Sequence, residues 1–241
     1  MDEIWITKFF NDNLAGLGNS ILGLVGLPAD PRPWTNFITM QLLVILLIVV
    51  VFALVRSRLS VDRPGKVQHL FEALFGFIQG QASESVEHGS AKYVPFFATL
   101  FIFILFMNLI GIIPGFESPT MTPAVPAGLA VALFLYYNYM GMREHGLRKY
   151  AAHFAGPMPL LAPLMVPIEV ISHFARPLSL TIRLYANMFA GEQVTMAFLG
   201  LTFLVLPSLF MGLHVFVSFL QAFIFSLLAM IYVGNAVAHE H

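Results

Sequence analysis

Long stretches without a charged residue divide the chain into apolar segments. Four of them carry no Lys, Arg, Asp or Glu: residues 33–55, 93–116, 118–142 and 193–239. They contain 23, 24, 25 and 47 residues, and roughly 20 apolar residues in a helix span the hydrocarbon core of a bilayer. The first three stretches therefore predict one membrane helix each, and the fourth is long enough to fold back near Gly200 and Pro207.

A fifth apolar region, residues 150–191, differs because it contains Glu169, Arg176 and Arg183. A helix from about Ala162 to Gly200 would be about 58 Å long, whereas the hydrocarbon is about 30 Å thick. Such a helix must tilt steeply, kink or begin outside the core. The pattern predicts an all-α polytopic membrane protein with about five membrane helices, the last two forming a long tilted hairpin.

The loop after the first span has a helical pattern of its own. Apolar residues recur there at Val67, Leu70, Phe71, Leu74 and Ile78. This spacing is typical of an amphipathic helix that lies at the membrane interface. It fits a helix packed on the membrane spans equally well, so both alternatives stay open.

These segments make one membrane domain over residues 1–241. In chain order we expect an external N-terminal segment (1–32), a first span (33–55), an internal loop with the amphipathic helix (56–92), a helical hairpin (93–142) and a tilted hairpin (150–238).

Basic residues orient the helices, because cytoplasmic loops are enriched in Lys and Arg. Two loops carry them: Arg56, Arg58, Arg63, Lys66 and Lys92 flank one, and Arg143, Arg148 and Lys149 flank the other. The loop at Glu117 has no Lys or Arg. We therefore expect both basic loops and the C-terminus inside, with the N-terminus, the Glu117 loop and the last hairpin turn outside.

Composition excludes several classes of protein. Hydrophobic residues make up 58% of the chain, charged residues 10%, and the net charge is −1, whereas soluble domains carry about 25% charged residues. A soluble enzyme and a nucleic-acid binder do not fit. Cysteine is absent, which excludes disulfides and thiolate sites. No phosphate-loop, zinc-protease or serine-hydrolase motif occurs, so we expect no catalytic activity, cofactor or metal; for His239-Glu240-His241 a solvated tail is favoured over a metal site.

Arg183 is the most informative residue of the chain. A charge at the bilayer centre costs about 2.5–3.5 kcal/mol on insertion scales. None of the residues three or four positions away is acidic: Ser179, Leu180, Ala186 and Asn187. Glu192 lies about 13.5 Å farther along a helix and roughly on its opposite side. The counter-charge must come from elsewhere in the chain, from water or from a partner subunit, unless Arg183 snorkels to an interface.

Two polar stripes face each other across the predicted hairpin. Ser179, Arg183 and Asn187 form the first stripe, which Arg176 joins unless Pro177 breaks the helical register; His214, Ser218 and Gln221 form the second. A turn centred at residues 202–203 brings Gln221 opposite Arg183 and His214 opposite Glu192.

The polar residues of these stripes have competing interpretations. Because histidine titrates near pH 6.5, His214 and Glu192 suit a proton relay, although a satisfied core histidine is the structural alternative. Gln221 and Asn187 could equally serve as hydrogen-bond contacts between helices. Glu169 and His173, toward the inner end, could line an aqueous vestibule or lie at the interface, and Arg176 could snorkel there.

Two segments carry a family resemblance. The sequence RPLSLTIRLYANMFAGE at residues 176–192 and the segment HVFVSFLQAFIF at residues 214–225 resemble subunit a of F-type ATP synthases. Residues 106–115 and 167–169 give weaker support, and the resemblance covers most of residues 35–241. Gly111 stands where some members carry a polar residue, so no role is transferred to it.

The resemblance implies a stator subunit of a rotary ATP synthase, packed against a ring of c subunits in a bacterial inner membrane rather than an organellar or thylakoid one. It implies two offset proton half-channels with Arg183 as the essential arginine between them. By the same resemblance Glu192, His214, Asn187 and Gln221 belong to the outer half-channel and Glu169 to the inner one. The implied partners are the c-ring, b-type peripheral stalk subunits, other ATP synthase subunits and the lipid bilayer, without nucleic acid.

Two other functions compete with this interpretation. A secondary transporter could use Arg183 to bind an anionic substrate, although such transporters usually show internal repeats and none is evident in this chain. A purely structural assembly subunit would need Arg183 only for packing.

Overall fold

The computed structural model describes residues 3–24, 26–60, 64–86, 89–113, 115–147, 149–150, 162–199 and 205–238. In these ranges the regular structure is helical throughout, which confirms the predicted all-α class. The α-helices are α1 (Trp5–Leu24), α2 (Asn36–Ser57), α3 (Lys66–Ser85), α4 (Val94–Leu109), α5 (Ala124–His145), α7 (Ala162–Leu199) and α8 (Val205–Val237), with short 3₁₀ turns η1 (Ser90–Lys92), η2 (Ile110–Ile112) and η3 (Pro119–Met121).

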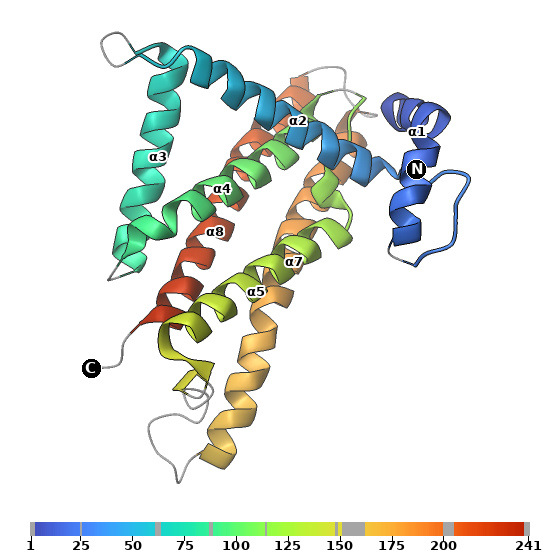
Figure 1. Cartoon of the computed structure of the whole chain (residues 1–241). Coiled ribbons are helices and arrows are strands. Elements are labelled where there is room, and N and C mark those ends of the chain that lie inside the picture. Colours follow the sequence, from blue (N-terminus) through green and yellow to red (C-terminus); the bar gives the residue numbers. More distant parts are fainter. Residues whose placement is uncertain are drawn as a thin grey trace.

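The core of the molecule forms around α8, which packs on α3, α4, α5 and α7 (Figure 1). Its sequence is apolar on nearly every side, as expected for a helix that is surrounded by others. The α8 residues at the centre of the core are Ala222, Phe225, Ala229, Met230 and Val233. They meet Phe97 and Phe101 of α4, Leu133 and Tyr137 of α5, and Leu180, Leu184 and Met188 of α7 in one buried cluster.

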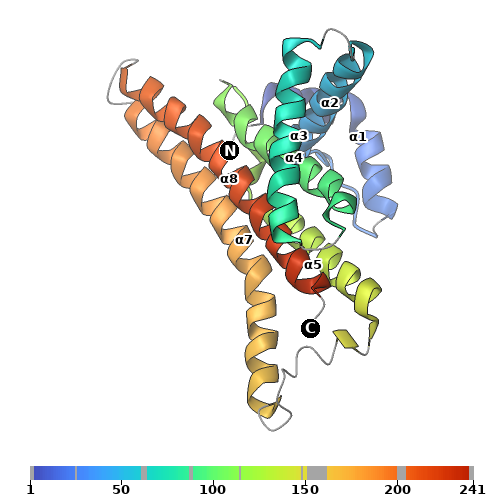
Figure 2. The same cartoon turned by 90° about the vertical axis from the view of Figure 1, so that its left-hand side faces the viewer.

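The long C-terminal hairpin is present. Figure 2 shows α7 and α8 side by side over most of their length, and Figure 1 shows the pair inclined to α2. The 38 residues of α7 make it about 57 Å long, close to the length expected from the sequence. The predicted turn at 202–203 lies outside the described residues.

Within the described ranges, four helices are long and apolar enough to cross a membrane: α2, α4 extended to Ile112, α5, and α8 from Ser208. The chain is therefore a polytopic membrane protein. The fifth expected span, α7, does not meet that criterion, because Glu169, Arg176, Arg183 and Glu192 lie within it. It nevertheless packs along α5 and α8, so its charges are held against membrane helices.

The segment predicted as a helical hairpin, residues 93–142, contains two helices with different main neighbours. Its two helices form as expected, but α4 packs mainly on α8 and α2, whereas α5 packs on α7 and α8. Both helices are apolar on all sides, so their sequences do not specify which neighbour they choose. They meet where Phe96 stacks on Tyr136 with ring centroids 3.7 Å apart.

The amphipathic helix combines both alternatives that its pattern left open. The C-terminal half of α3 packs on α4 and α8 and buries Ile78 and Ala82 completely. In its N-terminal half Val67 and Leu70 stay exposed. One half of α3 is therefore held by the bundle, and the other half leaves apolar side chains uncovered.

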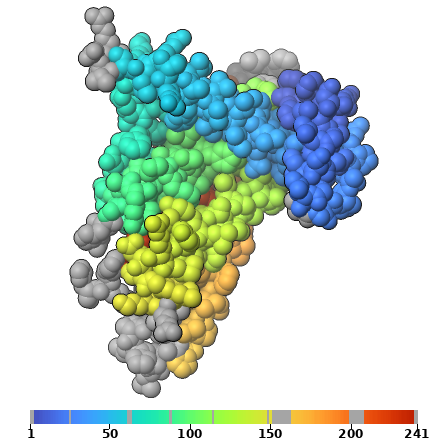
Figure 3. Space-filling model, in the orientation of Figure 1, coloured from blue at the N-terminus to red at the C-terminus, as the bar shows by residue number. Residues whose placement is uncertain are grey.

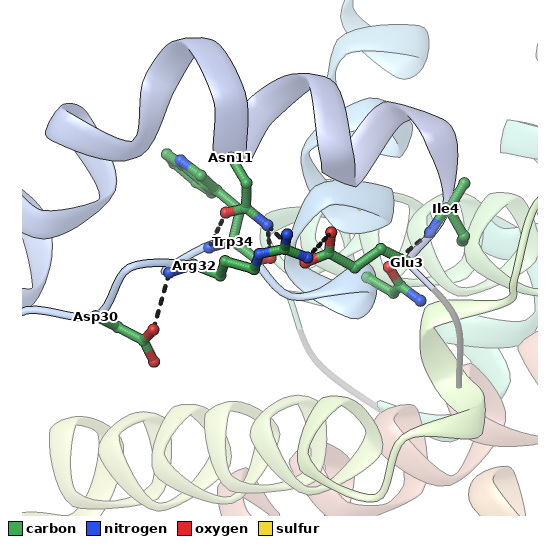
Figure 4. A network of polar contacts seen from close by, with 7 residues as sticks. Glu3, Ile4, Asn11, Asp30, Arg32 and Trp34 are labelled. Carbon is green, nitrogen blue, oxygen red and sulfur yellow. Dashed lines mark hydrogen bonds and ion pairs between the residues drawn. The ribbon is translucent and has the colours of Figure 1, made fainter.

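The N-terminal segment, where no helix was predicted, forms α1 beside the start of α2 (Figures 1 and 3). Figure 4 shows the contacts that hold it. The Asn11 side chain donates to the Trp34 carbonyl and accepts from the Trp34 N–H, both at 3.0 Å. Arg32 forms an ion pair of 2.7 Å with Glu3. The polar side chains of α1 thus tie it to the approach of the first span.

Candidate functional site

Arg183 lies half-buried on α7, on the flank of the face that Leu180 and Leu184 bury against the bundle. No ion pair or hydrogen bond joins it to another described residue. In particular, Gln221 is buried on α8 but does not hydrogen-bond to Arg183 in the described part of the chain. The guanidinium is thus neither paired with a described carboxylate nor fully exposed.

The surface next to Arg183 is apolar and open. Leu178 is 60% exposed and Ile182 54% exposed on α7. Ala186, one turn from Arg183, is also exposed, as are Ser179 and Asn187. Arg183 therefore borders an uncovered apolar helix face that carries two small polar side chains.

Toward the hairpin turn, the two long helices touch at Gly191 and His214. A methyl group placed on Gly191 would lie 3.2 Å from His214 Nδ1, so the ring packs directly on the glycine. Half-buried Glu192 follows in sequence. This contact agrees with the predicted hairpin register, which places Glu192 near His214.

A second carboxylate lies at this end. Glu117, in the connection between α4 and α5, is within electrostatic reach of Glu192. Asn36 at the start of α2 donates a 3.2 Å hydrogen bond to Glu117. The sequence analysis did not name Glu117 as a site residue. It could have been noticed because it is an isolated acidic residue in a loop without Lys or Arg.

A buried chain of hydrogen bonds continues inward from Glu117. The Thr120 hydroxyl donates to Asn108 Oδ1 at 2.8 Å and lies 2.7 Å from the Ser118 hydroxyl. Asn108 Nδ2 in turn points to the Ser218 carbonyl at 3.5 Å. The sequence analysis did not assign Asn108, Ser118 or Thr120 to the site. The feature that could have indicated them is that they are polar residues within otherwise apolar stretches.

Along the polar stripe of α8, two side chains keep buried polar atoms without a partner among the described residues, and Ser226, farther along the helix, is a third. Neither His214 Nε2 nor the Ser218 hydroxyl has a hydrogen-bond partner in the described structure. His214 is 8% exposed and Ser218 is fully buried. Because buried polar groups are nearly always satisfied by protein or water, this stripe suits a hydrated path.

At the other end of α7, Glu169 and Arg176 form an ion pair with a nitrogen–oxygen distance of 3.6 Å. The Arg176 guanidinium also lies over the Tyr232 ring, 5.3 Å from its centroid. Arg176, which the sequence placed beside Arg183 in one stripe, therefore has its counter-charge two helical turns away.

His173 completes the cluster at this end of α7. His173 Nε2 lies 2.9 Å from Asn138 Oδ1, which also accepts a 2.8 Å hydrogen bond from the Tyr150 hydroxyl. Burial raises the pKa of Tyr150 and keeps it a hydrogen-bond donor. A pocket of about 40 Å³, large enough for a water molecule, is lined by Tyr137, Tyr150, Glu169, His173, Arg176, Asn235 and Ala236. Of these, the sequence indicated only Glu169, His173 and Arg176.

No group of three or more His, Cys, Asp or Glu side chains in the described ranges could hold a metal ion. The terminal His239-Glu240-His241 segment lies outside those ranges.

Fold and site together define a polytopic all-α membrane protein that carries acidic, basic and histidine side chains along its longest hairpin. The family model for the ATP synthase A chain matches residues 37–234, and the chain belongs to that family. It is 66% identical over 232 residues to "ATP synthase subunit a" of Solibacter usitatus (strain Ellin6076), covering 96% of this chain and all of that protein.

Other relatives carry the same name. The protein of Koribacter versatilis (strain Ellin345) is 47% identical, with 99% of this chain and 98% of the relative covered. That of Campylobacter jejuni subsp. jejuni serotype O:23/36 (strain 81-176) is 41% identical, with 80% of this chain and 87% of the relative covered. The family match begins after α1, so α1 lies outside it.

Proposed function

We propose that this chain is the stator subunit of the membrane sector of a rotary ATP synthase and provides two offset half-channels for protons. Its partners are the c-ring, b-type peripheral stalk subunits and the other ATP synthase subunits. The chain itself catalyses no covalent reaction. Family membership and the distribution of charged residues along α7 support this function.

The observation that carries the proposal is the state of Arg183. A half-buried guanidinium without a carboxylate partner among the described residues is costly unless something supplies the charge. It borders an open apolar face with Leu178 and Ile182. A ring of apolar helices, each with one carboxyl group at mid-membrane depth, would cover that face and supply the counter-charge.

Arg183 would act by shifting the protonation of each passing ring carboxyl group. In lipid the neutral form of a carboxyl group is favoured, whereas a nearby positive charge favours the ionised form. The proton therefore leaves on arrival at Arg183, and a new one is bound before the site re-enters lipid. Lysine would replace it poorly, because lysine can lose its proton and lacks the planar fork of donors.

The outer half-channel would run from Glu117 past Glu192 and His214. The unpartnered polar atoms of His214 and Ser218 support water along this path. Asn187 on α7 and Gln221 on α8 would continue it toward Arg183.

The inner half-channel would pass the cluster at the other end of α7. Glu169 and His173 line its small pocket together with Arg176, and the Glu169 carboxylate would exchange the proton with the cytoplasm. Ser179 lies on the exposed side between this cluster and Arg183. Protons would thus enter at one end of α7 and leave at the other, with Arg183 between the two half-channels.

We infer a bacterial inner-membrane protein with its N-terminus outside and its C-terminus in the cytoplasm. The 3.2 Å ion pair between Lys92 and Glu144 joins the two basic loops, which supports their location on one side. The termini lie at opposite sides of the molecule in Figure 1, as this topology requires.

The test is Arg183→Ala in the assembled ATP synthase, measured as ATP-driven proton pumping in inverted membrane vesicles. We expect pumping to be lost while the complex purifies with all its subunits. Arg58→Ala, which removes an exposed arginine at the end of α2 and outside the proposed path, is the matched control and should pump normally. Normal pumping by Arg183→Ala would overturn the assignment.

The same experiment separates the competing functions. If Arg183 served only assembly, Arg183→Ala would yield an incomplete complex whose assembled fraction still pumps. If the chain were a secondary transporter, the purified chain alone would carry a substrate-dependent flux of an anion. We expect neither result.

A further inference from the structure

A pocket outside the proton path lies where α4 begins and α5 ends. It has a volume of about 430 Å³ and is lined by Lys92, Tyr93, Tyr136, Met140, Arg143 and Glu144. That volume is within the range of small-molecule sites. Figure 3 shows a recess on this face between the green start of α4 and the yellow end of α5. The proton path described above uses none of these side chains.

The charge of the pocket suits a single anion. Among its described lining residues, Lys92 and Arg143 each contribute one positive charge and Glu144 one negative charge, which leaves one positive charge. Lys92 is held in place by its 3.2 Å ion pair with Glu144 and lies over the Tyr93 ring at 4.8 Å. Arg143 is exposed and forms no ion pair with a described residue, so its guanidinium can bind a ligand.

The Tyr93 hydroxyl is a second, independent sign of a ligand. Tyr93 is 1% exposed, and no hydrogen bond of adequate geometry satisfies its hydroxyl within the described structure. The neighbouring Lys92 ammonium interacts with the hydroxyl oxygen, but an ammonium group only donates hydrogen bonds and cannot accept the hydroxyl hydrogen. A buried hydroxyl whose hydrogen has no acceptor is costly, and an anion bound beside Lys92 would accept a hydrogen bond from it.

The position of the pocket identifies the kind of anion. It opens at the ends of two membrane helices, Val94–Ile112 and Ala124–His145, at the level where lipid headgroups lie. On α5, the exposed residues Val131, Leu135 and Tyr139 form a stripe. This stripe lies beside Tyr136 and Met140, which line the pocket. An acyl chain would lie along such a stripe while its headgroup occupied the pocket.

We propose that this pocket binds the phosphate group of an anionic phospholipid, with Lys92 and Arg143 as charged ligands and the Tyr93 hydroxyl as a neutral donor. Basic pockets between membrane helices on the cytoplasmic side are known to suit such headgroups. The single negative charge of a phosphodiester balances the single positive charge of the pocket. Because a free phosphate ion has the same chemistry, the experiment distinguishes the two sources.

The experiment is native mass spectrometry of the purified full-length chain with phosphatidylglycerol, with phosphatidylcholine, and with inorganic phosphate as competitor. We expect one tightly held phosphatidylglycerol per chain that millimolar phosphate does not displace. Lys92→Gln with Arg143→Gln should weaken its binding about 30-fold, because each basic residue near an anionic lipid contributes about fivefold. The matched control is Arg58→Gln with Lys66→Gln, which removes two basic residues outside the pocket and should leave binding unchanged.

Tyr93→Phe separates binding from folding. Since the hydroxyl hydrogen has no acceptor among the described residues, we expect this variant to unfold at nearly the same temperature as the original chain in lipid-free detergent. Its affinity for phosphatidylglycerol should fall about tenfold, the effect of losing one hydrogen bond to a charged group. Equal retention of phosphatidylcholine, displacement by inorganic phosphate, or equal binding by the two double variants would each overturn the proposal.

Discussion

Two arginines on one helix have opposite electrostatic environments. Arg176 pairs with Glu169 at 3.6 Å and lies over the Tyr232 ring, so its charge is compensated within the chain. Arg183, seven residues later, has no such partner among the described residues. Because the cost of an uncompensated buried charge is large, our proposal assigns the counter-charge of Arg183 to a partner subunit.

Glu169→Gln tests whether the inner carboxylate moves protons or only neutralises Arg176. The Arg176 and Glu169 side chains are 27% and 39% exposed, and ion pairs of this kind contribute about 0–1 kcal/mol. We therefore expect the thermal unfolding of the complex to change little while ATP-driven pumping falls severalfold. Glu72→Gln, in an exposed pair on α3, is the control. Unchanged pumping by Glu169→Gln would remove Glu169 from the inner path.

Gly191→Val tests the contact between α7 and α8. Even the first carbon of the new side chain would lie 3.2 Å from His214 Nδ1, so the ring must move. Overpacking of this kind costs about 1–3 kcal/mol, and the displaced imidazole should slow pumping. Gly212→Val on α8, where an added carbon meets nothing within 4 Å, should pump at a near-normal rate. Equal rates in both variants would contradict a role for the His214 position.

Spacing along the sequence indicated some of the site residues but not their contacts. The stripe of Arg183 and Asn187 follows from helical periodicity alone. The hydrogen bond between Thr120 and Asn108 does not, because the two residues are twelve positions apart and Thr120 lies in the connection that follows α4. The partner of His173 was equally hidden, since Asn138 lies on a different helix.

At the scale of elements, a glycine allows α3 to approach α8. A methyl group on Gly234 would meet the Ser85 carbonyl oxygen at the end of α3. The approach is therefore between backbones, and no side-chain rotation can relieve it. The half of α3 that follows Phe75 is held on the bundle through this contact.

Gly234→Ala should displace the end of α3. We expect the complex to lose about 1–3 kcal/mol of stability and amide hydrogen exchange to increase in residues 78–85. Gly76→Ala is the control, because its added carbon meets nothing within 4 Å and alanine favours a helix by about 1 kcal/mol. Exchange that increases in neither variant would show that α3 does not depend on this contact.

Charge-free stretches predicted the membrane helices well, because length and apolarity together determine whether a segment can span a bilayer. They could not predict which helices pack together. For example, α4 and α5 are consecutive in the chain, yet each of them packs on α8 more than on the other. Helix α1 escaped prediction because its docking depends on Asn11 and Trp34, which are 23 residues apart.

At the scale of the whole molecule, α8 lies at the centre of the bundle and α7 leaves one side open. One side of α7 is buried in the bundle through Leu180, Leu184 and Met188, and the opposite side leaves Leu178 and Ile182 open. The proposed stator role requires a rotor on that open side, with Arg183 at the border. The central claim is therefore that a ring of c subunits contacts the open side of α7.

Cross-linking tests that claim most directly, and the absence of cysteine from the chain gives a clean background. Ala186→Cys is exposed and one turn from Arg183. A second cysteine is placed beside the mid-membrane carboxyl residue of the c subunit, and disulfide formation is measured in native membranes. Asn13→Cys on α1 is the control. We predict a cross-link from residue 186 and none from residue 13; a c subunit that never cross-links to residue 186 would contradict the account.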